Sequence, residues 1–189
     1  LNPEKFESKL VTGVEAENEG NMLDLMRAGA VEPIVIPSLG REISPRHDMA
    51  TLREVKAILL REKPHIVHTH TAKAGFVGRL AAKLTKTPII VHTFHGNVFK
   101  GYFSPAKTKL FIAIEKMLAV YTDRIVVLSE QQKNEILSLG IGTSEKFRII
   151  PLGLDLKPFL EIDNLKGELR RELNIENDVP LVGIVARLV

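Results

Sequence analysis

Residues 88–96 read PIIVHTFHG, and this stretch decides the fold class. The run Ile89–Val91 is apolar at successive positions, which is typical of a strand buried on both faces. Strands of this kind belong to parallel sheets with helices packed on them. Pro88 introduces the strand, and Gly96 follows it where a missing side chain permits close approach of a ligand. We therefore predict an α/β chain built on a Rossmann-like parallel sheet flanked by helices.

Similar apolar runs alternate with segments of helical period on both sides of this stretch. Strand–helix alternation indicates right-handed crossovers within a parallel sheet. The predicted strands are Lys9–Val14, Pro33–Pro37, His65–His70, Pro88–His95, Arg124–Ser129, Phe147–Leu152 and Leu181–Val185. The predicted helices are Gly20–Ala30, Asp48–Arg61, Ala74–Leu84, Pro105–Val120 and Glu130–Leu139.

The pattern changes after Asp155. We expect residues 1–155 to form the Rossmann-like domain and residues 156–179 to form a linker (Leu156–Asp163) with a charged helix (Leu165–Leu173). Residues 180–189 then start a new apolar strand, and a lone strand is not a stable unit. We expect this strand to open a second domain, the chain to be truncated at both ends, and the unpaired strand to cause self-association.

Composition excludes several classes of function. The 189 residues contain no cysteine, so disulfides, thiolate metal sites and cysteine nucleophiles are excluded, which suits a cytoplasmic location. The net charge of +3 comes from mixed charges without a basic block, so we expect no nucleic-acid partner. No apolar run is long enough to span a membrane, and no signal peptide is visible.

Polar side chains gather where three consecutive predicted strands end. In an open parallel sheet, ligands bind outside the carboxyl ends of the strands. This edge would carry His70 and Thr71 after one strand, His95, Gly96 and Asn97 after the next, and Ser129 and Glu130 after the third. We predict a binding site at this edge. Ser129 can also cap the helix that follows it, and Glu130 can complement that helix's dipole.

The six histidines do not form a recognisable metal motif. Strand alternation places His68 and His70 on one face, and it sends His92 and His95 to opposite faces. We expect His68 and His92 to be buried, hydrogen-bonded core residues and His70 and His95 to be functional. No metal and no cofactor are expected, and no GxSxG elbow, GxGxxG loop or Walker loop is present.

The segment Asn97–Ser104 carries aromatic and basic residues at the same edge. These side chains suit a sugar, a lipid carrier or a membrane face. They equally suit packing beneath the next helix, and the sequence leaves both interpretations open.

Four stretches in order resemble the N-terminal domain of family 4 glycosyltransferases, which are retaining enzymes of GT-B fold. They read KPHIVHTHTAKAGFVGRLAA, IIVHTFHGNVFKGYFSP, TDRIVVLSE and RIIPLGLDLKPF, and the terminal GIVARLV resembles the first strand of the family's second domain. The resemblance implies a cleft between two halves, with the acceptor mainly on the N-terminal side and the nucleotide-sugar donor on the other.

The resemblance also implies roles for single residues. His95 matches a histidine at the reaction centre, and Gly96 and Asn97 would shape its loop. Ser129 and Glu130 match a polar pair facing the cleft. Arg187 matches an arginine that contacts the donor diphosphate, a role that a guanidinium suits. The implied partners are a nucleotide-sugar donor and a saccharide or lipid-linked acceptor, with peripheral contact at the inner face of the membrane.

The chain also departs from the family pattern. The family's first strand, its glycine-rich loop, and the lysine and paired glutamates of its second domain are absent, and leucine replaces asparagine in Ile150–Gly153. We therefore expect the chain alone to be inactive. Two other hypotheses remain open: a sugar- or nucleotide-binding module without catalysis, and a sugar-nucleotide epimerase.

Overall fold

The computed structural model describes residues 2, 4–14, 32–40, 44–96, 104–154, 156–160, 167–176 and 178–184. The chain divides into two compact units, Leu1–Pro151 and Leu152–Val189. The first unit contains all of the strands found among the described residues.

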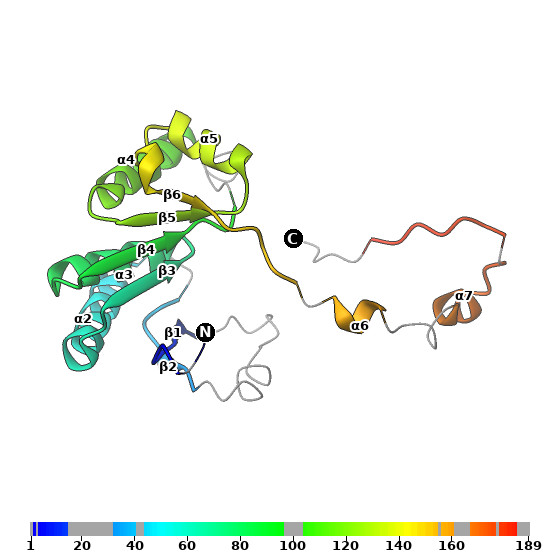
Figure 1. Cartoon of the computed structure of the whole chain (residues 1–189), viewed down its shortest axis with the longest axis horizontal. Helices are drawn as coiled ribbons and strands as arrows, with labels where there is room; N and C mark the ends of the chain where they lie inside the picture. Colours follow the sequence, from blue (N-terminus) through cyan, green and yellow to red (C-terminus); the bar gives the residue numbers. More distant parts are fainter. Residues whose placement is uncertain are drawn as a thin grey trace. The chain divides into compact units, whose positions relative to one another are not determined.

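The described strands form two parallel sheets (Figure 1). A pair is made by β1 (Val11–Gly13) and β2 (Ile34–Ile36). The larger sheet has the order β3-β4-β5-β6, with the bounds Ile66–His70, Ile89–Thr93, Arg124–Val127 and Phe147–Ile149. Every pairing in it is parallel, so the predicted α/β class and the parallel arrangement are confirmed.

Among the described residues of the first unit, four α-helices accompany the strands. They are α2 (Pro45–Glu62), α3 (Ala72–Leu84), α4 (Pro105–Val120) and α5 (Glu130–Ser138). Helix α2 begins earlier than predicted because Pro45 occupies a first-turn position, where its missing N–H costs no hydrogen bond. It ends at Glu62. The next residue, Lys63, has a left-handed backbone conformation and donates its N–H to the carbonyl of Leu59. The predicted helix Gly20–Ala30 lies outside the described residues.

Both ends of α5 follow the sequence prediction. The Ser129 hydroxyl accepts the Gln132 N–H at 3.2 Å and caps the first turn. At the other end Gly140 has a φ of +75°, a conformation that favours glycine. The N–H of Ile141 donates to the Ile136 carbonyl, and that of Gly140 donates to the Leu137 carbonyl. This pair of hydrogen bonds is a Schellman motif, which fixes where α5 stops.

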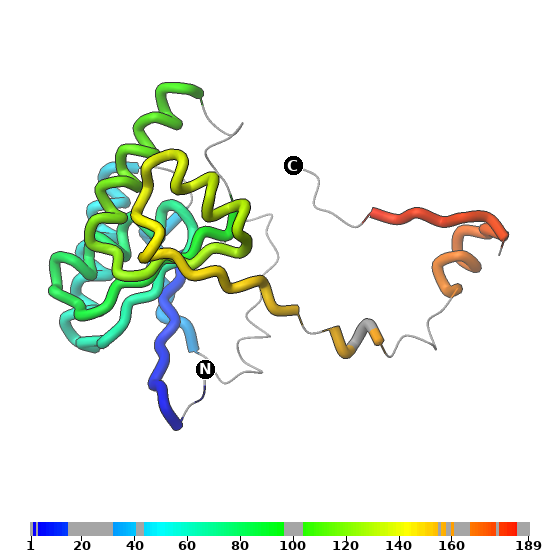
Figure 2. The backbone as a smooth tube through the Cα atoms, turned by 45° about the horizontal axis from the view of Figure 1, so that its top comes forward, coloured from blue at the N-terminus to red at the C-terminus, as the bar shows by residue number. Residues whose placement is uncertain are grey.

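The helices cover one face of the larger sheet. Helix α3 contacts β3 and β4, and α2 contacts α3 (Figures 1 and 2). The apolar core lies where α4 and α5 pack on the sheet. Its buried residues are Phe94, Ala119, Ile125, Val127, Ile136, Ile141 and Phe147. Strand alternation directs Thr69 and His92 toward α3 and directs His68, His70 and Thr93 to the other face. This assignment of faces places the polar groups described below.

The described part of the second unit contains two short helices, α6 (Lys157–Leu160) and α7 (Glu168–Glu172). Helix α7 lies within the predicted charged helix, whereas α6 falls in the stretch predicted to be a linker. Residues 181–184, the described part of the strand predicted over Leu181–Val185, form no ladder in this chain. A strand needs a hydrogen-bonded neighbour, so the prediction that these residues begin a second domain stays a prediction.

Candidate functional site

The carboxyl ends of β3 and β4 bring two of the predicted residues into direct contact. The parallel register sets His70 beside Thr93, so the chain leaving β4 passes close to His70. His70 Nδ1 and His95 Nε2 share a hydrogen bond of 2.8 Å, and their ring centroids lie 5.1 Å apart. One nitrogen donates and the other accepts, so the bond fixes the tautomer of both rings together. Both side chains are exposed to solvent.

A third imidazole supports this pair. The His68 ring lies 4.4 Å from that of His70, and His68 Nε2 is 2.7 Å from the Thr93 hydroxyl. The prediction that His68 is buried is wrong: it lies on the sheet face away from α3 and is exposed. Partial burial lowers the pKa of His70, and the neighbouring His68 and His95 lower it further. Burial and His95 likewise lower the pKa of His68, so both rings are neutral at pH 7.

The backbone is strained directly after His70. Thr71 has φ 63° and ψ 169°, a region that is populated almost only by glycine. Its side chain makes no capping hydrogen bond to α3. Strain of this kind costs about 1–3 kcal/mol, and it persists where the surrounding structure imposes it. It coincides here with the edge at which the sequence predicts a binding site.

His92 is buried on the opposite face of β4, as predicted. Its side chain is 1% exposed, its Nδ1 lies 2.9 Å from the Thr69 hydroxyl, and its ring contacts that of Phe94 edge-on. Burial, aided by the positive charge of Arg79, lowers the pKa of His92 to about 2. Gly75 leaves the space for this ring, since a Cβ there would lie 2.6 Å from His92 Cε1.

A buried ion pair lies beside His92 and joins α3 to α4. Arg79 Nη2 donates to both carboxylate oxygens of Glu115 at 2.7 and 2.8 Å, and Arg79 Nε donates to the Gly75 carbonyl. Both charged side chains are buried. Burial raises the pKa of Glu115, and the charge of Arg79 opposes that rise. The pair was not predicted from the sequence. Gly75 and Gly78 let α3 approach the strands, since a Cβ at either position would meet His92 or Thr69.

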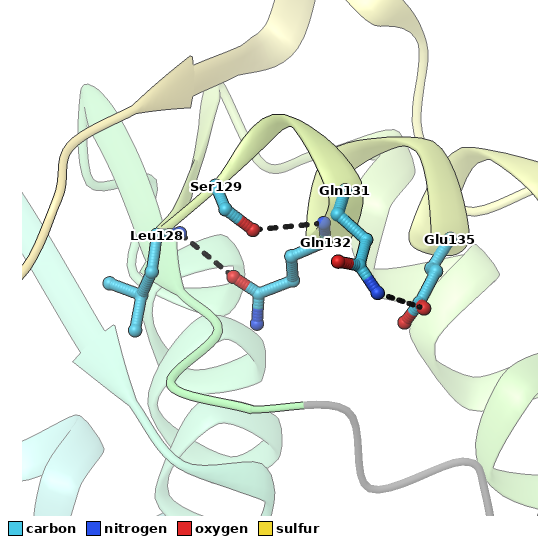
Figure 3. Close-up of a pocket in the computed structure, with 5 residues that line it drawn as sticks. All are labelled: Leu128, Ser129, Gln131, Gln132 and Glu135. Atoms are coloured by element: carbon cyan, nitrogen blue, oxygen red, sulfur yellow. Dashed lines mark hydrogen bonds between the residues drawn. The ribbon is translucent and has the colours of Figure 1, made fainter.

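The third predicted group, Ser129 and Glu130, follows β5, and Ser129 lines a shallow pocket of about 300 Å³ (Figure 3). Ser129 faces this pocket while capping α5. Glu130 is exposed and forms an ion pair with Lys133 at 3.3 Å, which favours a role at the helix start. Gln132, which sequence reasoning missed, accepts the Leu128 N–H and donates to the Phe94 carbonyl. Buried Gln132 therefore ties the ends of β4 and β5 together.

The remaining predicted residues are only partly described. Gly96 is exposed next to His95. Asn97, most of the aromatic and basic segment, and Arg187 lie outside the described residues. In the described ranges, no three histidine or acidic side chains are placed to share a metal ion. Within the same ranges, no helix is long and apolar enough to cross a membrane.

Comparisons with known proteins identify the family of this chain. Residues 11–158 match the model of Glycosyltransferase Family 4. An Escherichia coli protein named "UDP-Gal:alpha-D-GlcNAc-diphosphoundecaprenol alpha-1,3-galactosyltransferase" is 31% identical over 90% of this chain and 42% of its own length. The chain thus spans about two-fifths of that relative.

Solved structures share the fold. A glycosyltransferase from Rickettsia africae has a TM-score of 0.62 at 14% identity, over 93% of this chain and 52% of its own. A UDP-GlcNAc 2-epimerase from Neisseria meningitidis has a TM-score of 0.55 at 19% identity, over 91% and 47%. At such identities these similarities show the fold alone, whereas the family match covers most of the sequence. The chain belongs to Glycosyltransferase Family 4.

Proposed function

We propose that this chain is the acceptor-side part of a retaining glycosyltransferase that moves a sugar from a nucleotide-sugar to a saccharide or lipid-linked acceptor. The observation that carries the proposal is the His70–His95 pair at the carboxyl edge of the sheet in a member of this family. The E. coli relative is named for a GlcNAc-diphosphoundecaprenol acceptor, which supports a lipid-linked acceptor here.

In this reaction the bond from the anomeric carbon to the diphosphate breaks, and the diphosphate leaves with the electron pair. A new bond forms from that carbon to the acceptor oxygen, whose proton passes to the departing diphosphate. We assign His95 a contact with the reacting groups. Because His70 occupies His95 Nε2, the Nδ1 of His95 is the nitrogen left for the substrate. His70 is then the residue that orients His95, and the strained Thr71 fixes the chain next to it.

Other predicted residues complete the proposal. Arg187 would neutralise charge on the leaving diphosphate, and Gly96, Asn97, Ser129 and Glu130 would border the acceptor. The chain alone would bind without completing the transfer, because the donor-binding part belongs to the second domain of such enzymes. We also propose that the enzyme works in the cytoplasm at the inner face of the membrane. The 189-residue chain is proposed to self-associate.

The deciding test uses the longer enzyme, in which this chain is joined to a donor-binding domain. It measures turnover of a panel of nucleotide-sugars with and without a lipid diphosphate acceptor. Turnover of one donor that requires acceptor, and that falls about 10²–10³-fold in His95→Ala, supports the transferase. Isomerisation of the donor without any acceptor would instead favour the epimerase. Donor binding without turnover in either assay would favour a binding module.

A further inference from the structure

The start of α5 has the residue spacing of a capping box, with Ser129 and Gln132 three residues apart. One half of that motif is present, because the Ser129 hydroxyl accepts the Gln132 N–H (Figure 3). In the other half, the glutamine side chain ordinarily accepts the N–H of the capping residue itself. Here it accepts the N–H of Leu128 at 2.8 Å, and its amide nitrogen donates to the Phe94 carbonyl at 3.2 Å. The side chain therefore reaches beyond its own helix to the end of β4.

The Gln132 amide lies where the next hydrogen bond of the ladder between β4 and β5 would be. The Phe94 N–H donates to the Val126 carbonyl at 2.9 Å. In a regular parallel ladder, the hydrogen bond after this one joins the Leu128 N–H to the Phe94 carbonyl. Both of these groups bond to the Gln132 amide instead, so two hydrogen bonds in series replace one direct bond. The amide thus holds the ends of β4 and β5 apart.

This separation bears on where His95 lies. The Phe94 carbonyl belongs to the peptide unit that carries the His95 N–H, so its bond to Gln132 restrains the plane of that unit. The Phe94 side chain is 6% exposed and belongs to the apolar core, so the chain is anchored just before this peptide. Held away from β5, the chain continues to the point where His95 Nε2 meets His70 Nδ1 at the end of β3.

We propose that Gln132 is the positioning residue that holds His95 against His70, by taking the place of a ladder hydrogen bond between β4 and β5. The proposal rests on the proposed function only in treating His95 as the functional ring. It gives Gln132 no contact with substrate. The role of Gln132 is to keep the two strand ends apart, and the histidine pair is the result.

A purely structural role for Gln132 would have a different signature. Gln132 is buried, and a buried amide is hydrogen-bonded whatever its function. If Gln132 served only to satisfy the strand ends, its removal would change stability and leave the histidine pair intact. The contact between the His70 and His95 rings is therefore the deciding observable.

The first test removes the amide with Gln132→Ala. The Leu128 N–H and the Phe94 carbonyl can then bond to each other directly, so we expect the fold to persist while the chain after Phe94 moves toward β5. Circular dichroism should show the helix content of the parent. Asn134→Ala removes an exposed amide two residues further along α5 and is the matched control.

NMR of the 189-residue chain reads the histidine pair directly. In the parent and in Asn134→Ala, nuclear Overhauser contacts should join the His70 and His95 rings, whose centroids lie 5.1 Å apart. Gln132→Ala should lose these contacts. Burial lowers the pKa of His70, and the charges of His68 and His95 lower it further, so withdrawal of the His95 ring should raise the pKa of His70.

The second test makes the bond to Phe94 depend on pH. Gln132→Glu keeps an oxygen that accepts the Leu128 N–H, but its carboxyl can donate to the Phe94 carbonyl only when protonated. In the longer enzyme, kcat of this variant relative to the parent should fall about 10–100-fold as the pH rises through the pKa of the introduced carboxyl, measured by carbon NMR, while KM changes little. Asn134→Asp adds the same charge to the exposed side of α5 and should show no such fall.

Two outcomes would overturn the proposal. One is a Gln132→Ala chain that retains both the contacts between the rings and the parent pKa of His70. The other is a kcat ratio for Gln132→Glu that stays flat across the pKa of its carboxyl. The NMR experiment involves no sugar chemistry, so its failure leaves the proposed transferase standing. A longer enzyme that turns over no donor would count against the proposed function, and the NMR result would still decide the role of Gln132.

Discussion

The imidazoles of His70 and His95 are hydrogen-bonded to each other across the carboxyl ends of two adjacent parallel strands, Nδ1 to Nε2 at 2.8 Å. Each ring thus sets the tautomer of the other. His68 and Thr93 restrain this pair from the side of the sheet, so the pair is oriented before any ligand arrives.

Removing the His70 ring should therefore reduce turnover by the longer enzyme without removing His95. We expect His70→Ala to lower kcat about 10–100-fold, the range for a residue that orients a functional one, while His70→Asn retains part of the activity through its amide. The pH dependence of kcat should change in His70→Ala, because His95 loses its partner. His65→Ala, an exposed histidine at the opposite end of β3, is the matched control. Equal rates for all three variants would contradict the orienting role.

Relieving the backbone strain at Thr71 should stabilise the fold. Glycine tolerates φ 63° and ψ 169°, so Thr71→Gly should raise the free energy of unfolding by about 1 kcal/mol after its own entropy cost. Thr71→Ala keeps a Cβ and should bring no gain. Urea unfolding of the 189-residue chain measures both. If the strain serves the site, the glycine variant of the longer enzyme should also lose turnover.

Breaking the Arg79–Glu115 pair should be costly. Glu115→Leu leaves a buried guanidinium without its partner, and we expect a loss of about 3–5 kcal/mol in the free energy of unfolding. The double variant Arg79→Met with Glu115→Leu should recover much of that loss, because no unpaired charge remains. The exposed Glu130–Lys133 pair is the control, and Lys133→Ala should cost less than about 1 kcal/mol. A double variant no more stable than the single one would argue against this account.

Burial of His92 should make the free energy of unfolding depend on pH. Its folded-state pKa of about 2 lies below the unfolded value near 6.5, so the unfolded chain binds the proton more readily. The stabilising contribution is therefore complete above pH 6.5 and is lost as the pH falls toward the folded pKa. The slope within this window is about 1.4 kcal/mol per pH unit.

His92→Asn can keep the hydrogen bond to Thr69 but does not titrate, so it should flatten the unfolding free energy between pH 6 and pH 4. Denaturant unfolding at several pH values, compared between the two proteins, isolates the effect of this one ring. Identical slopes would show that His92 is not the group responsible.

Gly75 should not tolerate a methyl group even though alanine favours helices. A Cβ at this position would lie 2.6 Å from His92 Cε1, so we expect Gly75→Ala to cost about 1–3 kcal/mol. The same substitution should cost less in a His92→Ala background, where the ring is gone. A thermodynamic cycle over the four proteins measures this coupling, and simple additivity would refute it.

Parts of the fold were accessible from sequence because β3, β4 and β5 each carry a short run of Val and Ile, although β3 and β4 are buried mainly on one face. β3, β4 and β5 all lie within their predicted ranges, and the Ser129 cap and the Gly140 end of α5 follow from local chemistry. His68 was misassigned because periodicity gives the face of a residue, whereas exposure depends on what packs against that face. The tail near Leu181 has the composition of a strand, but strand formation requires a partner.

The candidate site was predictable to a similar extent. His70 and His95 meet because the carboxyl ends of parallel strands share an edge, which follows from topology alone. The Arg79–Glu115 pair joins residues far apart in sequence, and such pairing leaves no local pattern. The strain at Thr71 is equally invisible, because threonine normally avoids that conformation.

The strand order of the larger sheet bears on how the protein is made. Each of β4, β5 and β6 pairs with the strand that precedes it in the chain, so no pairing waits for a segment synthesised later. The sheet can therefore grow at one edge, one strand and helix at a time, as the nascent chain leaves the ribosome. A chain interrupted after β5 would lack only β6 of the four strands described for this sheet, and its histidine pair would already have both of the strands that hold it.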